Sequence, residues 1–226
     1  MSNYGKLSLK GSENFEKKMS KLLDDIADDI RLYVNESFYE TVILIGGYGR
    51  GEGGVVKVNG VEEAHNNLDF IIISKNIDSS AEDVLYKQFE DIFNHHTKNT
   101  NLLVEFSILD ANKFKNCQPL VITYDMKYGH KLIAGRNNIL INNKNFELNK
   151  IPSWDVRNLM VNRGTLLIIN DLMLNKKELK ELTVKEKKIV IKHWIKAIIG
   201  YGDALLFHLG DYHYSYAEKQ KRMKNQ

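Results

Sequence analysis

The feature that most limits the possible fold is a glycine cluster between two short apolar runs, within residues 41–74. The first run, Val42 to Ile45, has the β-branched and aliphatic composition of a buried strand. The second run, Phe70 to Ile73, follows Asp69 directly and predicts another strand. Glycines allow backbone N–H groups to approach a ligand closely and to adopt positive φ. The segment therefore predicts a strand, a phosphate-binding turn and a second strand that begins with a carboxylate.

Polar side chains interrupt the predicted strands at few positions. Because side chains alternate between the two faces of a strand, Asn67 and Asp69 are expected to project to the same side. A third strand is predicted over residues 102–109, LLVEFSIL, in which Glu105 is the lone carboxylate and Ser107 shares its face. An unpartnered Asp at the entry of an apolar run costs several kcal/mol. Asp69 is therefore expected to bind a cation or, alternatively, to cap the strand entry through backbone hydrogen bonds.

This arrangement resembles the nucleotidyltransferase superfamily, which has the DNA polymerase β-like fold. The family pattern is an apolar strand, Gly-Gly or Gly-Ser, a short helix, and two carboxylates that alternate on the next strand. The segment Gly46 to Glu52, GGYGRGE, is similar to the corresponding turn of bacterial uridylyltransferases that modify a nitrogen-signalling protein. The resemblance covers residues 42–109. One position departs from the pattern, since the family has Asp-x-Asp where this chain has Asn67-Leu68-Asp69.

The resemblance implies an α+β fold: a small mixed β-sheet nucleotidyltransferase domain with flanking helices, followed by a C-terminal helical domain. It also implies transfer of a nucleoside monophosphate from an NTP to an acceptor that the sequence does not identify. Mg²⁺ or Mn²⁺ would be held by Asp69, by Asn67 and, in the role of the family's third acid, by Glu105. The residues expected to bind the nucleotide in the glycine turn are Gly46, Gly47, Tyr48 and Arg50. Two further readings are that Arg50 is a surface residue paired with Glu52 and that Tyr48 packs on the sheet edge.

Three other phosphate-binding loops share some of these glycines. A Walker-type loop requires Lys-Ser/Thr after its last glycine, and Gly51 is followed by Glu52. A dinucleotide fingerprint is formally present, but residues 53–66 are too polar and broken by glycines to form the helix that must precede its acidic residue. A kinase-like glycine loop is not followed by His-Arg-Asp or Asp-Phe-Gly. The nucleotidyltransferase interpretation is therefore favoured.

The composition agrees with a protein that folds in a reducing compartment. The chain has 226 residues, a net charge of +3 and a single cysteine, Cys117, which excludes an internal disulfide. The N-terminus lacks the apolar core of a signal peptide, and no apolar run reaches the length of a membrane span. We expect a cytoplasmic protein without membrane contact. Apolar residues at three- and four-residue spacing predict helices over 13–35 and 81–95, and a further strand is expected over 130–134.

The pattern becomes helical after the predicted domain boundary at residue 150, so that 1–150 form the nucleotidyltransferase-like domain and 151–226 a helical domain. Long helices are predicted over 153–174 and 183–209, and a third helix or a frayed tail over 214–226. Lys192, Lys196 and Asp203 can share one helix face. They form a solvated surface or, with Lys196 as a nucleotide-binding residue, a basic wall for a triphosphate. By resemblance, such a domain closes over the nucleotide; it also allows oligomerisation.

The Asn67 departure leaves two other functions open. An amide oxygen can bind Mg²⁺ but brings no charge, so one alternative is a catalytically weakened pseudoenzyme that binds the nucleotide. The helical domain also permits an antitoxin-like interaction protein that binds a second protein and no nucleotide.

Overall fold

The computed structural model describes residues 3–176 and 178–225. It divides the chain into two compact units, Met1–Glu147 and Leu148–Gln226. The expected α+β class is confirmed, with a small mixed sheet and flanking helices in the first unit and helices in the second. The division falls between Glu147 and Leu148, against the expected boundary at residue 150.

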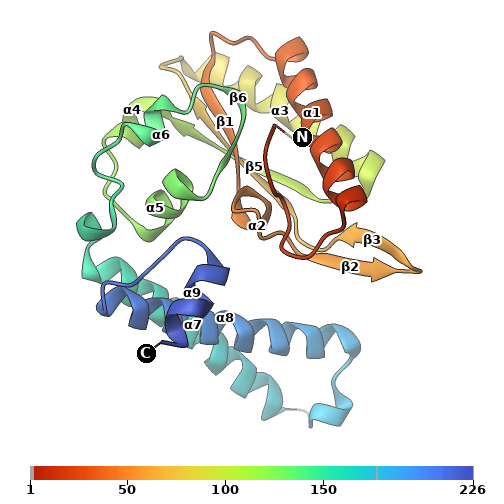
Figure 1. The fold of residues 1–226 in the computed structure, drawn as a ribbon, viewed down its shortest axis with the longest axis vertical. Coiled ribbons are helices and arrows are strands. Elements are labelled where there is room, and N and C mark those ends of the chain that lie inside the picture. Colours follow the sequence, from red (N-terminus) through yellow and green to blue (C-terminus); the bar gives the residue numbers. More distant parts are fainter. Residues whose placement is uncertain (1–2, 177, 226) are drawn as a thin grey trace. The chain divides into compact units, whose positions relative to one another are not determined.

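The first unit is built on a four-stranded sheet with the order β5-β4-β1-β6 (Figure 1). Its central strands, β1 (Tyr39–Ile45) and β4 (Leu68–Ser74), are antiparallel and come from the two apolar runs beside the glycine cluster. Strand β5 (Val104–Asp110) lies parallel to β4, and β6 (Lys131–Gly135) lies antiparallel to β1. The glycine cluster therefore leaves the sheet from its centre, with β4 on one side and β6 on the other.

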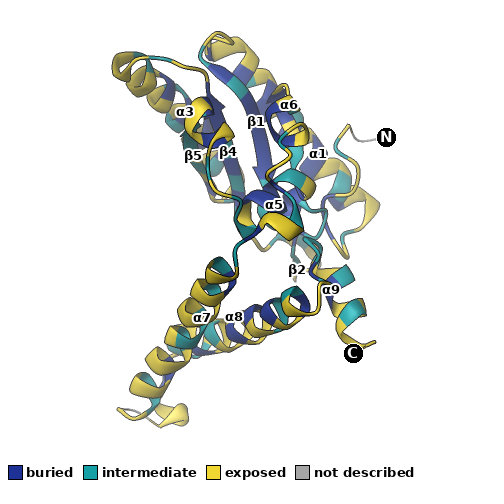
Figure 2. Cartoon of the chain, turned by 90° about the vertical axis from the view of Figure 1, so that its left-hand side faces the viewer, coloured by how far each residue is buried: buried dark blue, intermediate teal, exposed yellow. Residues whose placement is uncertain are grey.

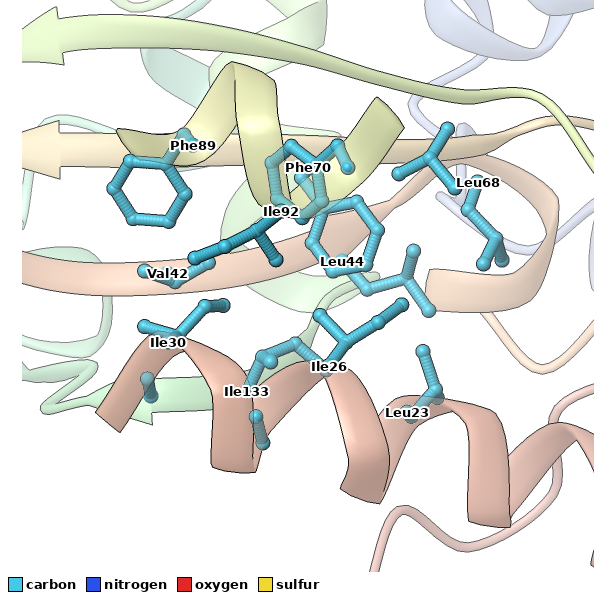
Figure 3. Packing of buried hydrophobic residues seen from close by; sticks show 14 of the residues in the cluster. Leu23, Ile26, Ile30, Val42, Leu44, Leu68, Phe70, Phe89, Ile92 and Ile133 are labelled. Carbon is cyan, nitrogen blue, oxygen red and sulfur yellow. The ribbon is translucent and has the colours of Figure 1, made fainter. Parts of the chain in front are cut away.

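One face of the sheet is covered by α1 (Glu13–Tyr33) and α3 (Ser79–Thr100). Figure 2 shows that β1 is buried along most of its length, and Figure 3 shows how α1, β1, β4 and α3 share one cluster of side chains. In that cluster Ile26 and Ile30 of α1 pack toward Leu44 and Val42 of β1, as their helical spacing predicts. This apolar layer holds the sheet rigid behind the glycine turn.

The opposite face is covered by three short helices, α4 (Ala111–Lys115), α5 (Val121–Tyr128) and α6 (Asn138–Ile141). Ile43 and Ile73 from the sheet form a second cluster there with Phe114, Leu140 and Phe146. Ile45 and Ile71 border this cluster, so it becomes less buried toward the glycine turn. Side chains that share this face with Ile71 therefore leave the core as they approach the turn.

Between the glycine turn and β4 the chain forms a hairpin, and Asn-Gly, here Asn59-Gly60, is the residue pair that favours such a tight turn. Strands β2 (Val55–Val58) and β3 (Val61–Ala64) pair antiparallel, and Asn59 and Gly60 have φ of 52° and 81°. One local prediction is wrong: the helix expected to end at His95 continues to Thr100. His96 lies inside it, buried, with Nε2 2.8 Å from Asp29 Oδ2 of α1. This contact with α1 stabilises the additional turn of α3. The spacing of apolar residues in the sequence does not reveal it.

The second unit is a helical hairpin of α7 (Ser153–Leu174) and α8 (Val184–His208), followed by α9 (Tyr216–Met223). Short 3₁₀ turns lie at Leu148–Lys150 and Leu179–Glu181. A capping box lies at the start of α8, since Thr183 accepts from Glu186 N and Glu186 accepts from Thr183 N. No helix in the described part of the chain combines the length and hydropathy that crossing a membrane requires.

Candidate functional site

Two carboxylates meet at the end of the sheet where the glycine turn begins. Asp69 and Glu105 are register partners on the parallel strands β4 and β5, and Asp69 is also the partner of Ile45, the last residue of β1. Register partners on neighbouring strands project to the same face. The face is the one that carries Ile71, beyond the edge of its apolar cluster. Both acids therefore project to one face of the sheet, which the shared metal-binding role implied by the resemblance requires.

The glycine turn lies directly against Asp69. Residues Gly46–Gly49 form the one-turn helix α2, and Gly46 has a φ of +71°. A Cβ atom on Gly46 would lie 2.6 Å from Asp69 Oδ2. Glycine is required at this position both because its backbone is left-handed and because the carboxylate occupies the space of a side chain. The backbone of the turn and the first acid of β4 therefore form one continuous site.

The carboxyl group of Asp69 is half-buried, and its electrostatic surroundings are uneven. Burial is the main factor that raises its pKa above the ordinary value of 3.8, and the charge of Glu105 raises it further. Arg50 acts in the opposite direction and lowers the pKa. A carboxyl group whose ionisation is disfavoured by burial and by a neighbouring carboxylate is one that a bound cation would stabilise in its charged form.

Asn67 contacts one of the two acids, Glu105. Its Nδ2 donates a hydrogen bond of 2.8 Å to Glu105 Oε2. An Asp at this position would have placed a third negative charge beside Glu105 instead of a donor. The amide therefore holds Glu105 in place, and its Oδ1 remains the atom of Asn67 suited to a cation.

Arg50 follows α2 and forms part of an ion pair at the turn. Its Nε lies 3.4 Å from Glu52 Oε2, and the two side chains are only 12% and 9% exposed. The expected pairing with Glu52 is thus present, but neither residue is a solvated surface charge. Because Arg50 also lowers the pKa of Asp69, its positive charge acts on the acid site.

Tyr48 does not line an open pocket, and its expected nucleotide contact is corrected here. Its side chain is fully buried, and its hydroxyl donates to Gly54 O at 2.7 Å. The ring also fills the space beside Gly53, where a Cβ would lie 2.0 Å from Tyr48 Cδ1. Tyr48, which is part of α2, therefore packs inside the fold against Gly53 and binds Gly54, the last two residues of the glycine cluster.

An N-terminal segment that sequence reasoning missed supports the same turn. Gly53 N donates to Leu7 O at 3.0 Å, and Leu9 N donates to Gly53 O at 3.3 Å. Glu16 of α1 in turn accepts from the backbone N–H groups of Leu7 and Ser8. The alternation Leu7-Ser8-Leu9 is the only signal in the sequence for this short extended segment.

Lys196 belongs to α8 in the second unit and is characterised within that unit alone. Its pKa is lowered by partial burial and, less strongly, by the charges of Lys192 and Arg163. The basic cluster expected from sequence therefore includes Arg163. Asp203 is instead paired with Lys219, with Nζ and Oδ1 2.8 Å apart. The nucleotide contact expected of Lys196 stays a prediction.

The side chains at Asp69 offer a divalent cation few charged ligands. Among residues 3–176 and 178–225, no group of three or more His, Cys, Asp and Glu side chains is arranged to hold a metal ion. Mg²⁺, however, is commonly bound by one or two carboxylates together with substrate phosphates and waters. Asp69, Glu105 and the amide of Asn67 are a set of this kind. The residues present fit Mg²⁺ or Mn²⁺ bound together with a phosphate ligand.

Comparison of the chain with protein-family models, with curated proteins and with solved structures found no match.

Proposed function

We propose that the first unit is a metal-dependent nucleotidyltransferase that transfers a nucleoside monophosphate from an NTP to an acceptor. The observation that carries the proposal is the register pairing of Asp69 with Glu105 beside a glycine turn whose first residue touches Asp69. In this proposal the carboxylates hold the cation, and the half-buried backbone of Gly46 and Gly47 binds the phosphates that the cation also contacts. The nucleotidyltransferase arrangement of the domain is part of this proposal.

Each residue has a defined task in the reaction. Asp69 and Glu105 would hold Mg²⁺, which when bound neutralises phosphate charge and lowers the pKa of an acceptor hydroxyl. The Gly46 and Gly47 amides orient the β- and γ-phosphates as leaving pyrophosphate. Arg50 stabilises the negative charge that grows on the pyrophosphate as the bond to the α-phosphorus breaks. Asn67 keeps Glu105 oriented through its 2.8 Å hydrogen bond.

Binding is tested first, with the four NTPs each added in MgCl₂, in MnCl₂ and in EDTA. We expect at least one NTP to raise the melting temperature only when the metal is present, by about 5–10 °C at a hundredfold excess over Kd. Ser107→Ala is the matched control, because Ser107 shares the face of Glu105 two residues further along β5 and carries no charge. An NTP effect that persists in EDTA would contradict metal-dependent binding at this site.

Transfer is tested next with α-labelled NTP, by measuring pyrophosphate release with and without small-molecule, protein and RNA acceptors. Labelled acceptor together with pyrophosphate supports a transferase. Metal-dependent NTP stabilisation without pyrophosphate from any acceptor class supports the pseudoenzyme, which the neutral Asn67 favours. Absence of NTP stabilisation contradicts both.

A separate prediction concerns Asn67→Asp. The substitution removes the hydrogen bond to Glu105 and adds a third negative charge. We expect the melting temperature in EDTA to fall and the affinity for Mg²⁺ to rise by about tenfold, which corresponds to about 1.4 kcal/mol. Asn66→Asp is the matched control: it makes the same charge change at a side chain whose Oδ1 accepts from Gly54 N. Equal Mg²⁺ affinities in the two variants would show that Asn67 does not face the cation.

A further inference from the structure

Large apolar side chains are exposed along one side of α8, in the second unit. Ile198 is the most exposed of them, at 73%. Figure 2 shows long exposed stretches on both α7 and α8. The residues at issue, called the α8 stripe, are Ile191, Trp194, Ile195, Ile198, Tyr201 and Leu205. A contiguous set of this kind is rare on a monomer and marks an interaction site.

Apart from Tyr201, which lies at its edge, the α8 stripe is not the side of α8 that packs against α7. That inner side is made of Val190, Ala197, Gly200 and Ala204, which are all buried. Arg163 of α7 lies against Gly200, since a Cβ there would be 2.4 Å from Arg163 Cγ. The contact between α7 and α8 is therefore made mainly by small residues of α8. The large apolar side chains of α8 lie outside this contact.

The stripe continues onto α7 beside Tyr201. A Cβ on Gly164 would lie 2.9 Å from the Tyr201 hydroxyl oxygen, so these two positions are neighbours across the hairpin. Met160 and Leu167, four residues before and three residues after Gly164, share its side of α7 and are also exposed. The exposed apolar surface thus spans both helices.

The α8 stripe is nearly symmetric about Ile198 along the chain. Ile191 and Leu205 lie seven residues on either side of it, and Ile195 and Tyr201 lie three residues on either side. The remaining pair is Trp194 and Gly202, four residues on either side. Apart from its chain neighbours and the nearby backbone of α8, no heavy atom lies within 4 Å of the position that a Cβ on Gly202 would occupy, so there is open space for a large ring.

We propose that the α8 stripe is a twofold interface between two copies of this chain, with the axis near Ile198. When two copies of a helix pack antiparallel about a twofold axis, a residue that precedes the axis position in the sequence contacts, in the other copy, the residue that follows the axis position by the same number of residues. Apolar side chains then face apolar side chains, and Trp194 of each copy fits over Gly202 of the other. The stripe with Met160 and Leu167 offers on the order of 500 Å² per copy, before polar flanks, compared with ~800 Å² in a standard interface.

The first test is the mass of the full chain in solution, by sedimentation at several concentrations. We expect a species of about twice 26.1 kDa. Ile198→Glu should raise the dissociation constant by at least about a hundredfold, because the twofold places two charges in an apolar contact. The matched control is Leu172→Glu, since Leu172 is also exposed but lies near the loop end of α7. A monomeric wild type, or equal weakening by both substitutions, would overturn the proposal.

The second test locates the axis. In a Cys117→Ser background, Ile198→Cys should form an intermolecular disulfide under mild oxidation, because a residue on a twofold axis meets its own copy. Leu172→Cys in the same background should not. Disulfide formation at Leu172 but not at Ile198 would show a different interface, and cross-linking only to another protein in a lysate would show a foreign partner; either outcome overturns the proposal. The inference is independent of the proposed activity.

Discussion

Replacing Asp69 by Asn is expected to abolish metal-dependent NTP stabilisation and to lower any transfer rate by more than about a hundredfold. Substitutions of outer-shell partners of metal ligands cost about 10- to 100-fold, and Asp69 is proposed as a direct ligand. Asn has nearly the same shape, so the contact with Gly46 is kept while the charge is lost. Titration with Mg²⁺, in the presence of an NTP that raises the melting temperature of the wild type, measures the effect.

The same variant is expected to be as stable as the wild type in EDTA, or more stable. Burial and Glu105 raise the pKa of Asp69 in the folded chain, so the ionised carboxylate opposes folding. The stability that its protonated form contributes is fully present below the ordinary pKa of 3.8 and is lost as pH rises through the higher folded pKa. Wild type and Asp69→Asn should therefore converge at about pH 3, and the wild type should be the less stable at pH 7.

The free energy of unfolding in EDTA, measured between pH 3 and pH 8, distinguishes a cation site at Asp69 from an Asp69 that only caps the strand entry. If Asp69 capped the strand entry, its carboxylate would stabilise the fold, and Asp69→Asn would be less stable at pH 7 than at pH 3 relative to the wild type. That outcome would remove the acid pair as a cation site even if the NTP bound elsewhere. Ser107→Ala should show no pH-dependent difference.

The first part of the acid site was predictable because strand alternation is a strictly local rule. The apolar runs located β1, β4 and β5, and a period of two placed Asp69 and Asn67 on one side. Whether Glu105 lay on the same face depended on the register of two strands, which the resemblance implied and the structure shows. The hairpin was predictable for a similar reason, since Asn59-Gly60 specifies its own turn.

Contacts between distant segments were not predictable from residue patterns. Leu7 and Leu9 form backbone hydrogen bonds with Gly53, which is more than forty residues away in the sequence. The periodicity of apolar residues within a segment cannot predict such a contact. His96 stays helical because Asp29 of α1 is its partner. Tyr48 sits in a glycine-rich turn without periodicity, so its burial depended on Gly53 and Gly54 folding back over it.

The burial of Tyr48 leads to the largest expected loss of stability. Tyr48→Ala should lower the free energy of unfolding of the first unit by about 3–5 kcal/mol, because it leaves a cavity beside Gly53 and removes the bond to Gly54 O. Tyr48→Phe keeps the ring and should cost only about 0.5–1.5 kcal/mol. Urea unfolding of both variants measures the difference.

The pair of variants also separates packing from ligand binding. If Tyr48 acts only inside the fold, Tyr48→Phe retains the metal-dependent NTP stabilisation of the wild type, because the hydroxyl faces Gly54 and not the nucleotide. Gly53→Ala should resemble Tyr48→Ala in stability, since its added methyl group meets the same ring. Loss of NTP stabilisation in a Tyr48→Phe variant of unchanged stability would instead place the hydroxyl on the ligand. The glycine turn would then have to open when the nucleotide binds, because Tyr48 is inaccessible in the fold described here.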